Sequence, residues 1–387
     1  MIKFIFFTLS ILMSCSSFAA DVVDENSDKF RNYSIEYFYD ASKKMQIEDV
    51  AGKSFFKKIP SQFALGYKDG NAWFKINISN KSNSDELVLT LSEVFWTTFD
   101  AYEKDNGAWL VQKNGLKTPI DERSIKNPYP SFLIKIKPLA SKVIYIKGNS
   151  VSSHIGNISL FTKDEYYKNK NITINEVYNI YVVLLMIILI LISYMYFKVR
   201  ERVYIFYLAY IMSFAFWISV QSGLYLSFGI TGWKDALHVI GASLVFFLIM
   251  FSKHLLKLEK HSPVIKMMFD FSAWIVAISG LAIVFQVPYA NLFFNIYSSI
   301  FFMGLLIVAI RAWLMNYFIQ AKYYLIALAF YMPTMGLMTL TYNGFLSNQD
   351  YTRYSFIIGS FIEVLVFSYI LILKYNERNR YLHKDNG

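Results

Sequence analysis

The sequence predicts an exported β-sandwich of jelly-roll type followed by an all-α bundle of seven transmembrane helices. The 387 residues are 55% hydrophobic, with a mean hydropathy of +0.34, which is unusual for a soluble chain of this length. The second half holds seven apolar runs, each near the roughly 20 residues that a helix needs to cross a bilayer. The first half instead shows runs with period-two alternation, which is typical of half-buried antiparallel strands.

Residues 1–19 have the pattern of a signal peptide. Lys3 supplies a basic start, residues 4–13 are apolar, and the small residues Ser17 and Ala19 follow. We expect cleavage after Ala19, because the apolar run is too short for a membrane span. An alternative is that residues 12–15 form a lipoprotein processing box, in which case Cys15, the only cysteine, is lipidated.

Residues 20–168 are predicted to form the sandwich. Residues 72–79 and 131–137 alternate most clearly, and Gly, Asn, Asp and Pro clusters separate the runs. We expect about eight strands at this spacing. The other predicted strands are residues 35–39, 87–91, 97–102, 109–112, 142–147 and 155–161.

Three aromatic residues of the sandwich are candidates for ligand binding, since a flat ring can stack on the face of a sugar. They are Trp96, Trp109 and Tyr129. The alternative for these rings is a place in the core, which we expect for Trp73 and Tyr102. We expect no catalytic group, metal site or cofactor here, because no triad, paired acids or zinc-ligand spacing occurs in the sequence.

Residues 174–375 are predicted to form the transmembrane domain, and residues 376–387 a short basic cytoplasmic tail. Short polar or Gly- and Pro-bearing segments separate the apolar runs. The predicted spans are residues 178–197, 204–224, 236–256, 264–286, 292–314, 323–342 and 354–373.

The basic residues predict which way the bundle faces. Lys and Arg gather after the first, third, fifth and seventh spans, and such loops stay in the cytoplasm. We therefore expect the sandwich in the periplasm and the C-terminus in the cytoplasm. The net charge of +10 is explained by these loops, so no nucleic-acid partner is expected. Arg200, Arg202, Arg378 and Arg380 are the candidates for coupling to a cytoplasmic partner.

Glu363 is predicted to lie near the middle of the last span, where an ionisable residue is costly and indicates a function. Gly359 lies one turn earlier on the same helix face, where a small residue favours close helix packing. The carboxyl group is either a structural latch between helices or part of a switch. Pro333 is expected to interrupt the sixth span. Residues at matching depth, and hence candidate partners of Glu363, are Ser213, Ser243, Tyr331 and Thr334.

The order of these features resembles bacterial seven-transmembrane receptors with diverse intracellular signalling modules (7TMR-DISM) that carry the type 2 extracellular domain. In the first half, residues 71–76 (NAWFKI) and 127–132 (NPYPSF) are similar to the family. In the second half, residues 197–207 (FKVRERVYIFY), 251–258 (FSKHLLKL) and 321–325 (AKYYL) are similar, and so is Gly359 followed by Glu363.

The resemblance implies a receptor in the bacterial inner membrane that binds an envelope ligand, such as a saccharide, through its sandwich. Family members usually continue into a cytoplasmic effector, whereas only residues 375–387 follow the last span here. We therefore expect a separate cytoplasmic signalling protein as partner. An alternative is a non-signalling envelope scaffold that holds another exported protein. We do not expect an enzyme, because the sequence contains no His-Glu-x-x-His or Gly-x-Ser-x-Gly motif.

Overall fold

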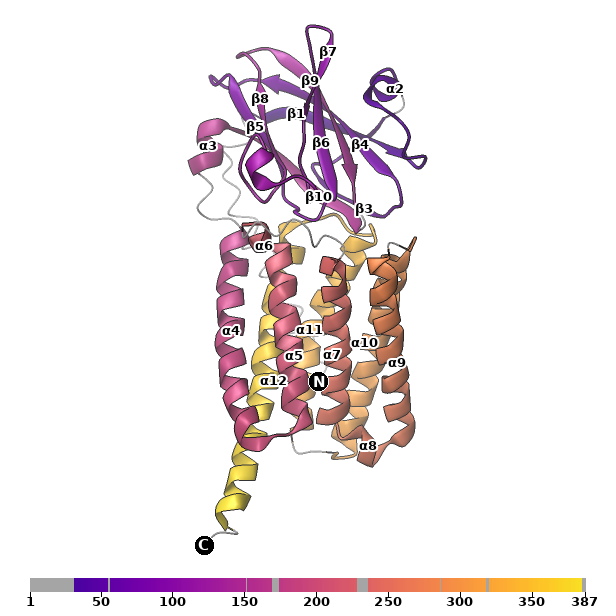
Figure 1. The fold of residues 1–387 in the computed structure, drawn as a ribbon, viewed down its shortest axis with the longest axis vertical. Helices are drawn as coiled ribbons and strands as arrows, with labels where there is room; N and C mark the ends of the chain where they lie inside the picture. Colours follow the sequence, from indigo (N-terminus) through magenta and orange to yellow (C-terminus); the bar gives the residue numbers. More distant parts are fainter. Residues whose placement is uncertain are drawn as a thin grey trace.

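The computed structural model describes residues 31–54, 56–150, 152–168, 174–227, 236–285, 287–317 and 320–384. The predicted signal peptide, including Cys15, lies outside these residues. A β-sandwich sits on one end of a bundle of long helices (Figure 1). We call this the sandwich end of the bundle, and the opposite end the far end.

The sandwich consists of two antiparallel sheets, as predicted. One sheet has the strand order β2-β1-β4-β9-β6-β7 and the other β3-β10-β5-β8. The register between β1 and β4 runs without interruption from Arg31↔Asn80 to Asp40↔Asn71. The strands are β1 (Arg31–Asp40), β2 (Lys57–Ile59), β3 (Gln62–Tyr67), β4 (Asn71–Asn80), β5 (Glu86–Leu91), β6 (Thr98–Asp105), β7 (Ala108–Gln112), β8 (Ser131–Lys135), β9 (Ser141–Asn149) and β10 (Ser153–Thr162).

All eight predicted strands are present, and the structure adds β2 and β3. β2 has only three residues, which is too few to show a period. In β3 the pattern is disturbed because its pairing with β10 shifts register between Ser153 and Ile155. Apolar side chains from both sheets meet in the core, where Phe74, Phe99 and Ile146 are buried. The short helix α2 (Ile47–Ala51) packs on Trp73 outside this core.

Seven long helices follow, close to the predicted ranges. They are α4 (Ile174–Val199), α5 (Arg202–Gln221), α7 (Ala236–Leu255), α9 (Pro263–Val284), α10 (Ala290–Leu314), α11 (Ala321–Tyr342) and α12 (Asp350–Lys384). Six of them are long and apolar enough to cross a membrane over their described residues, and α7 is apolar over the shorter range Val239–Leu255. Short helices include α3 (Lys163–Lys168), α6 (Leu224–Ser227) and α8 (Leu258–His261).

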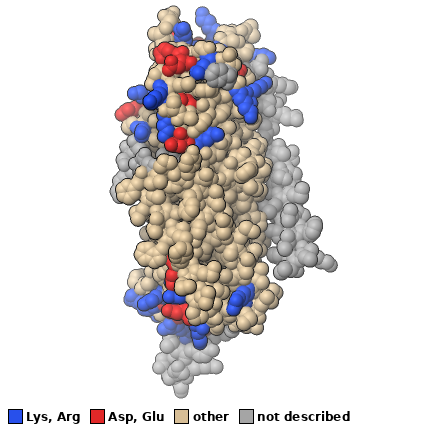
Figure 2. Space-filling model, turned by 90° about the vertical axis from the view of Figure 1, so that its right-hand side faces the viewer, with Lys and Arg blue, Asp and Glu red and all other residues tan. Residues whose placement is uncertain are grey.

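The distribution of charge agrees with a membrane-embedded bundle. On the face drawn in Figure 2, Lys, Arg, Asp and Glu gather on the sandwich and at the far end, and a broad uncharged belt separates them. On the long helices, large apolar side chains such as Ile190, Met303 and Ile307 are more than 60% exposed. Such exposure is expected where the solvent is lipid.

Candidate functional site

Two of the three aromatic residues predicted to bind a ligand are buried in the sandwich. Trp96 is 0% exposed, and its indole N–H donates to the carbonyl of Ile155 at 3.1 Å. Tyr129 is also buried. The expectation that these rings are open to a ligand is therefore wrong, because both complete the apolar packing near strand ends. Trp109 on β7 is half-buried, packing edge-on against Tyr145, and its ligand role stays a prediction.

The sandwich is fixed to the bundle through residues 342–349, which join α11 to α12 and which we call the docking loop. Ser153 donates to the carbonyl of Tyr342 at 2.5 Å, and the ring of Tyr342 stacks on Phe95 at 6.2 Å. Asn348 donates to the carboxylate of Glu93 at 2.9 Å. These contacts connect the sandwich to the start of α12.

Two glycines allow the backbones to approach closely at this interface. Gly66 on β3 and Gly344 in the docking loop both have positive φ, at 76° and 82°. A Cβ on Gly344 would lie 3.0 Å from the backbone nitrogen of Gly66. A side chain at Gly344 would therefore push the sandwich and the bundle apart.

A cavity of about 170 Å³ lies between the sandwich and the bundle, and we call it the chamber. Its walls come from α5, α7, α10, α11 and α12 and from the sandwich residues nearest to them. Trp217, Tyr331 and Phe356 lie together on its bundle side, with Trp217 and Phe356 at 5.1 Å and Tyr331 and Phe356 at 6.1 Å between ring centroids. None of its described lining residues is charged.

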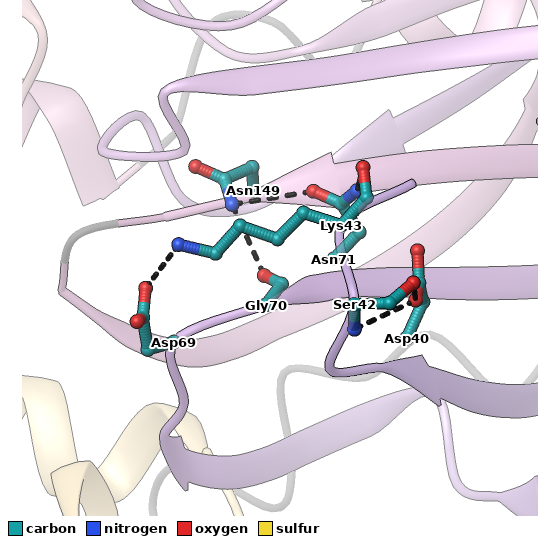
Figure 3. Close-up of polar contacts among 7 residues, drawn as sticks. All are labelled: Asp40, Ser42, Lys43, Asp69, Gly70, Asn71 and Asn149. Carbon is teal, nitrogen blue, oxygen red and sulfur yellow. Dashed lines mark hydrogen bonds and ion pairs between the residues drawn. The ribbon is translucent and has the colours of Figure 1, made fainter. Parts of the chain in front are cut away.

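A second, polar cavity of about 260 Å³ adjoins the chamber, and we call it the vestibule. The two cavities share Tyr67, Ser152 and Asn291. Lys43 pairs with Asp69 on the rim of the vestibule, as Figure 3 shows. The vestibule therefore offers a polar approach to an apolar chamber.

The rim is held in place by side-chain to backbone contacts of the sandwich. Asn149 donates to the carbonyl of Gly70 at 3.0 Å and to Asn71 Oδ1 at 3.3 Å (Figure 3). On the adjoining turn, Ser42 donates through its hydroxyl to Asp40 at 2.5 Å and through its backbone N–H at 3.0 Å. Burial alone would raise the pKa of Asp40, but the hydrogen bonds from Ser42 and Met45 outweigh this effect and lower it.

Glu363 lies inside the bundle, as predicted, and is 0% exposed. Its Oε2 accepts a hydrogen bond from the hydroxyl of Tyr210 at 2.7 Å, while Oε1 has no partner among the described residues. The partner was not one of the four residues expected at matching depth. Tyr210 was missed because a tyrosine in an apolar run counts toward the span and does not stand out as polar.

Gly359 lies in the contact between α12 and α11, whereas Pro333 lies on the exposed side of α11. A Cβ on Gly359 would lie 2.4 Å from Thr334 Oγ1 and 3.1 Å from the carbonyl of Phe330, so the two helices touch here. Pro333 lies inside α11, but the helix runs unbroken from Ala321 to Tyr342, so the predicted interruption is not seen, and the side chain is exposed on the surface of the bundle. Gly359 is therefore a packing residue, whereas a role for Pro333 as a hinge stays a prediction.

A row of aromatic residues on α5 follows α12 from the chamber to the far end, and we call this contact the seam. Below Trp217 come Phe214 and then Tyr210, with ring centroids 6.1 and 5.9 Å apart. Tyr207 donates to the carbonyl of Val364 at 2.6 Å, and Tyr204 donates to that of Leu371 at 3.0 Å. The seam therefore joins the aromatic wall of the chamber to the part of α12 around Leu371.

The seam ends in an ion-pair cluster at the far end. Glu201, immediately before α5, accepts from Arg378 at 2.6 Å and also pairs with Lys374, and both cations lie on α12. Burial alone would raise the pKa of Glu201, but the hydrogen bonds and charges of Lys374 and Arg378 lower it below its ordinary value. Of the four residues predicted to couple to a cytoplasmic partner, only Arg378 is seen to belong to this ion-pair cluster.

The other predicted coupling residues lie elsewhere or cannot be placed. Arg200 packs over the rings of Tyr196 and Phe197 at 5.6 and 5.2 Å. Arg202 is exposed at the start of α5. The side chain of Arg380 lies outside the described residues. Glu201 was missed from the sequence, where it reads as an isolated acid within a basic loop.

His154 occupies a buried place in the sandwich, close to the docking contact made by Ser153. It is 0% exposed and lies 4.9 Å from Trp96 between ring centroids. Burial, with a smaller contribution from the charge of Lys68, lowers the pKa of His154 to about 4. Within the described part of the chain, no cluster of three or more His, Cys, Asp or Glu side chains could hold a metal ion.

Two family models match the chain. The model described as 7TM diverse intracellular signalling matches residues 175–374. The model described as 7TMR-DISM extracellular 2 matches residues 32–162. A search of the curated proteins found no match. The first match covers the helix bundle and the second covers the sandwich, so both parts of the observed fold are accounted for.

Proposed function

The chain belongs to the 7TM diverse intracellular signalling family, and from this membership we propose that it is a sensor that passes an envelope signal along α12 to a separate cytoplasmic protein. It is a multi-pass membrane protein with an extracellular domain ahead of its helices. In this proposal the membrane is the bacterial inner membrane and the far end lies in the cytoplasm. The Lys and Arg side chains near the far end support this orientation.

The observation that carries the proposal is the continuity of α12. The helix has 35 residues, which gives a length of about 52 Å at 1.5 Å per residue. Its first residues follow the docking loop that contacts the sandwich, and its last turns extend past the other helices (Figure 1). A helix is stiff along its axis, so a displacement of the docking loop reaches the far end.

The partner is proposed to bind the projecting part of α12. Asn376, Glu377 and Arg378 are exposed there, beyond the end of the apolar run. A ligand shifts the arrangement of α12 only if it binds two arrangements with different affinity. The sandwich end, where the chamber lies between the two domains, is a place where such a difference can arise.

The ligand is proposed to come from the envelope. A saccharide is one proposed ligand. Since Trp96 and Tyr129 are buried, Trp109 is the candidate ring on which it would stack. We expect no enzymatic activity, because the sequence contains no His-Glu-x-x-His or Gly-x-Ser-x-Gly motif.

Site-specific photo-crosslinking in cells tests the proposal. A photoreactive amino acid is placed at Asn376 on α12, and a matched one at Leu110 on β7, which is 47% exposed. The proposal predicts a discrete adduct between position 376 and a soluble cytoplasmic protein. Adducts at position 110 alone, with an exported protein, would contradict it and favour an envelope scaffold.

A further inference from the structure

We propose that the chamber between the sandwich and the bundle binds an uncharged aromatic molecule of one or two rings that carries a hydrogen-bonding group. This inference deepens the proposed function and rests on it only for the consequence of binding, not for binding itself. Neither family match assigns a ligand or a binding residue.

The volume of the chamber sets the size of the molecule. At about 170 Å³, the chamber is slightly larger than a cavity of about 150 Å³ that is known to hold benzene. A single substituted ring fits without change, and a fused pair of rings fits after small side-chain movements. A disaccharide is too large for the chamber as it stands.

The lining of the chamber selects an aromatic molecule. Trp217, Phe294, Tyr331 and Phe356 offer ring faces and edges, which favour offset or edge-on contacts with another ring. Met335 and Met338 add polarisable thioethers, which make favourable contacts with aromatic rings and adapt to irregular shapes.

The absence of charge among the described lining residues selects against ions. Moving an unpaired carboxylate or ammonium group into such a site costs several kcal/mol or more, and about 1–3 kcal/mol is lost even for an unpaired neutral polar group. An anionic or cationic ring would find no opposite charge in the chamber. A neutral ring with one hydroxyl or N–H group fits this environment.

Two polar side chains in the wall are available to that group. Ser298 is 5% exposed, and its hydroxyl has no hydrogen-bond partner among the described residues. Asn295 uses its Oδ1 to accept from Asn343 at 2.8 Å, and no described residue accepts from its amide N–H groups. Buried polar groups are normally paired, so an unpaired hydroxyl in a cavity wall suggests that a ligand completes it.

The vestibule provides the route into the chamber. It shares three lining residues with the chamber, and its rim carries Lys43, Lys68 and Asp69. A molecule that is soluble in water but mainly apolar can pass from this polar rim into the chamber. A molecule bound in the chamber would contact both the sandwich and the aromatic residues of the seam nearest to the chamber.

The experiment measures binding of four probes to the full chain in lipid nanodiscs by equilibrium dialysis, with empty nanodiscs subtracted for partition into lipid. Indole and phenol are the expected ligands, benzoate tests charge and glucose tests the saccharide proposal. We expect saturable binding of indole and phenol, and at least a tenfold weaker interaction with benzoate and glucose. Tighter binding of benzoate than of indole would overturn the inference, and so would tighter binding of glucose that Gly241→Leu, which fills the chamber, weakens.

One variant and a matched control locate the site. A Cβ at Gly241 meets only Phe294, at 3.9 Å, so Gly241→Leu fills the chamber without a clash at the backbone. Gly304 has open space at its Cβ on the exposed side of α10, so Gly304→Leu makes the same change outside the chamber. We expect Gly241→Leu to weaken indole binding at least tenfold and Gly304→Leu to change it less than twofold. Equal effects would overturn the inference.

Ser298→Ala tests the polar contact separately. We expect phenol binding to weaken about fivefold, the effect of one hydrogen bond, and toluene binding to stay the same. An equal loss for phenol and toluene would contradict the role of Ser298. These binding measurements need no cytoplasmic partner. The inference about the chamber can therefore be refuted while the crosslink at Asn376 is still observed, and the crosslink can be absent while the chamber still binds indole.

Discussion

The two halves of the bundle differ in how α5 meets α12. In the half near the far end, Tyr204 and Tyr207 are hydrogen-bonded to α12 and Glu201 pairs with Lys374 and Arg378. In the half near the sandwich, the same two helices border a cavity, and the nearby Ser298 hydroxyl has no partner among the described residues. Unmade hydrogen bonds are costly inside a membrane. We therefore expect the proposed ligand to change the sandwich half more easily than the far half, which in our proposal transmits the change.

The largest expected loss of stability comes from a substitution at Gly359, which lies where the two halves of the bundle meet. Gly359→Leu would place side-chain atoms where Thr334 Oγ1 and the carbonyl of Phe330 now lie, so α11 and α12 must separate. We expect a loss of about 3 kcal/mol or more, which follows from overpacking. Fluorescence-detected size-exclusion chromatography after heating measures it. Gly336→Leu on the exposed side of α11 is the control, and an equal loss there would show that Gly359 is not a packing site.

Acid is expected to weaken the sandwich end before the far end. His154 has a pKa of about 4 in the folded chain against about 6.5 when unfolded, so below pH 6.5 the unfolded chain binds the extra proton. Stability is therefore complete above pH 6.5 and falls as the pH approaches 4, at about 1.36 kcal/mol per unit. By pH 5 the loss is about 2 kcal/mol.

Thermal unfolding of the full chain between pH 7 and pH 5 measures this loss. His154→Phe should remove most of the slope, because the ring still packs on Trp96. The lowered pKa of Glu201 predicts a different pH range for the far end. The stability that Glu201 contributes is complete above the ordinary pKa of a glutamate and is lost only as the pH falls through the lower pKa of Glu201 in the folded chain. An unchanged slope in His154→Phe would rule out the histidine as the cause.

A smaller effect is expected when the single described partner of Glu363 is removed. Tyr210→Phe leaves the carboxyl group without its 2.7 Å hydrogen bond and should cost about 1 kcal/mol. Tyr369→Phe on the exposed side of α12 is the matched control. Chemical denaturation in detergent compares the two, and equal losses would show that the contact adds nothing.

Glu363→Gln separates a latch from a switch. The amide retains a hydrogen-bond acceptor for Tyr210, so folding and insertion should survive. If Glu363 acts only as a latch, the crosslinked adduct at Asn376 should persist in this variant. Loss of the adduct from a folded, inserted protein would show that the carboxyl group takes part in signalling.

The smallest effect is expected at the ion pairs of the far end. Arg378 is about half exposed, so Arg378→Ala should cost less than about 1 kcal/mol. A double-mutant cycle with Glu201→Gln measures the coupling, which should decrease at high salt. A coupling that does not change with salt would mean that packing, and not charge, joins the two residues.

The sequence was most informative where a single period describes an element. The alternation in β4 and the long apolar run of α10 gave the right elements with nearly the right ends. It failed for Trp96 and Tyr129, because a ring near a strand end reads the same whether it faces solvent or the core. It also gave no sign of the chamber, which forms only when residues from five helices and the sandwich come together.

Glu363 shows how far such reasoning reaches at a site. Its depth in the membrane stays a prediction, whereas its burial was predicted from spacing and is confirmed. The hydrogen-bond partner of Glu363, Tyr210, was not predicted. Which face of α5 points toward α12 depends on helix packing, and the sequence alone does not reveal it. The docking loop was missed for the same reason, since Gly344 matters only through its contact with Gly66.

Distance measurement by pulsed electron paramagnetic resonance tests whether the docking loop controls the far end of α12. Spin labels are attached through Lys260→Cys on α8 and Asn376→Cys on α12, both exposed, after Cys15→Ser removes the only cysteine. Gly344→Ala meets the Gly66 backbone nitrogen at 3.0 Å, whereas Gly107→Ala has equal positive-φ strain and no neighbour within 4 Å. Transmission along α12 predicts that Gly344→Ala shifts or broadens the distance distribution and that Gly107→Ala leaves it unchanged. An identical distribution in Gly344→Ala and the parent protein would contradict it.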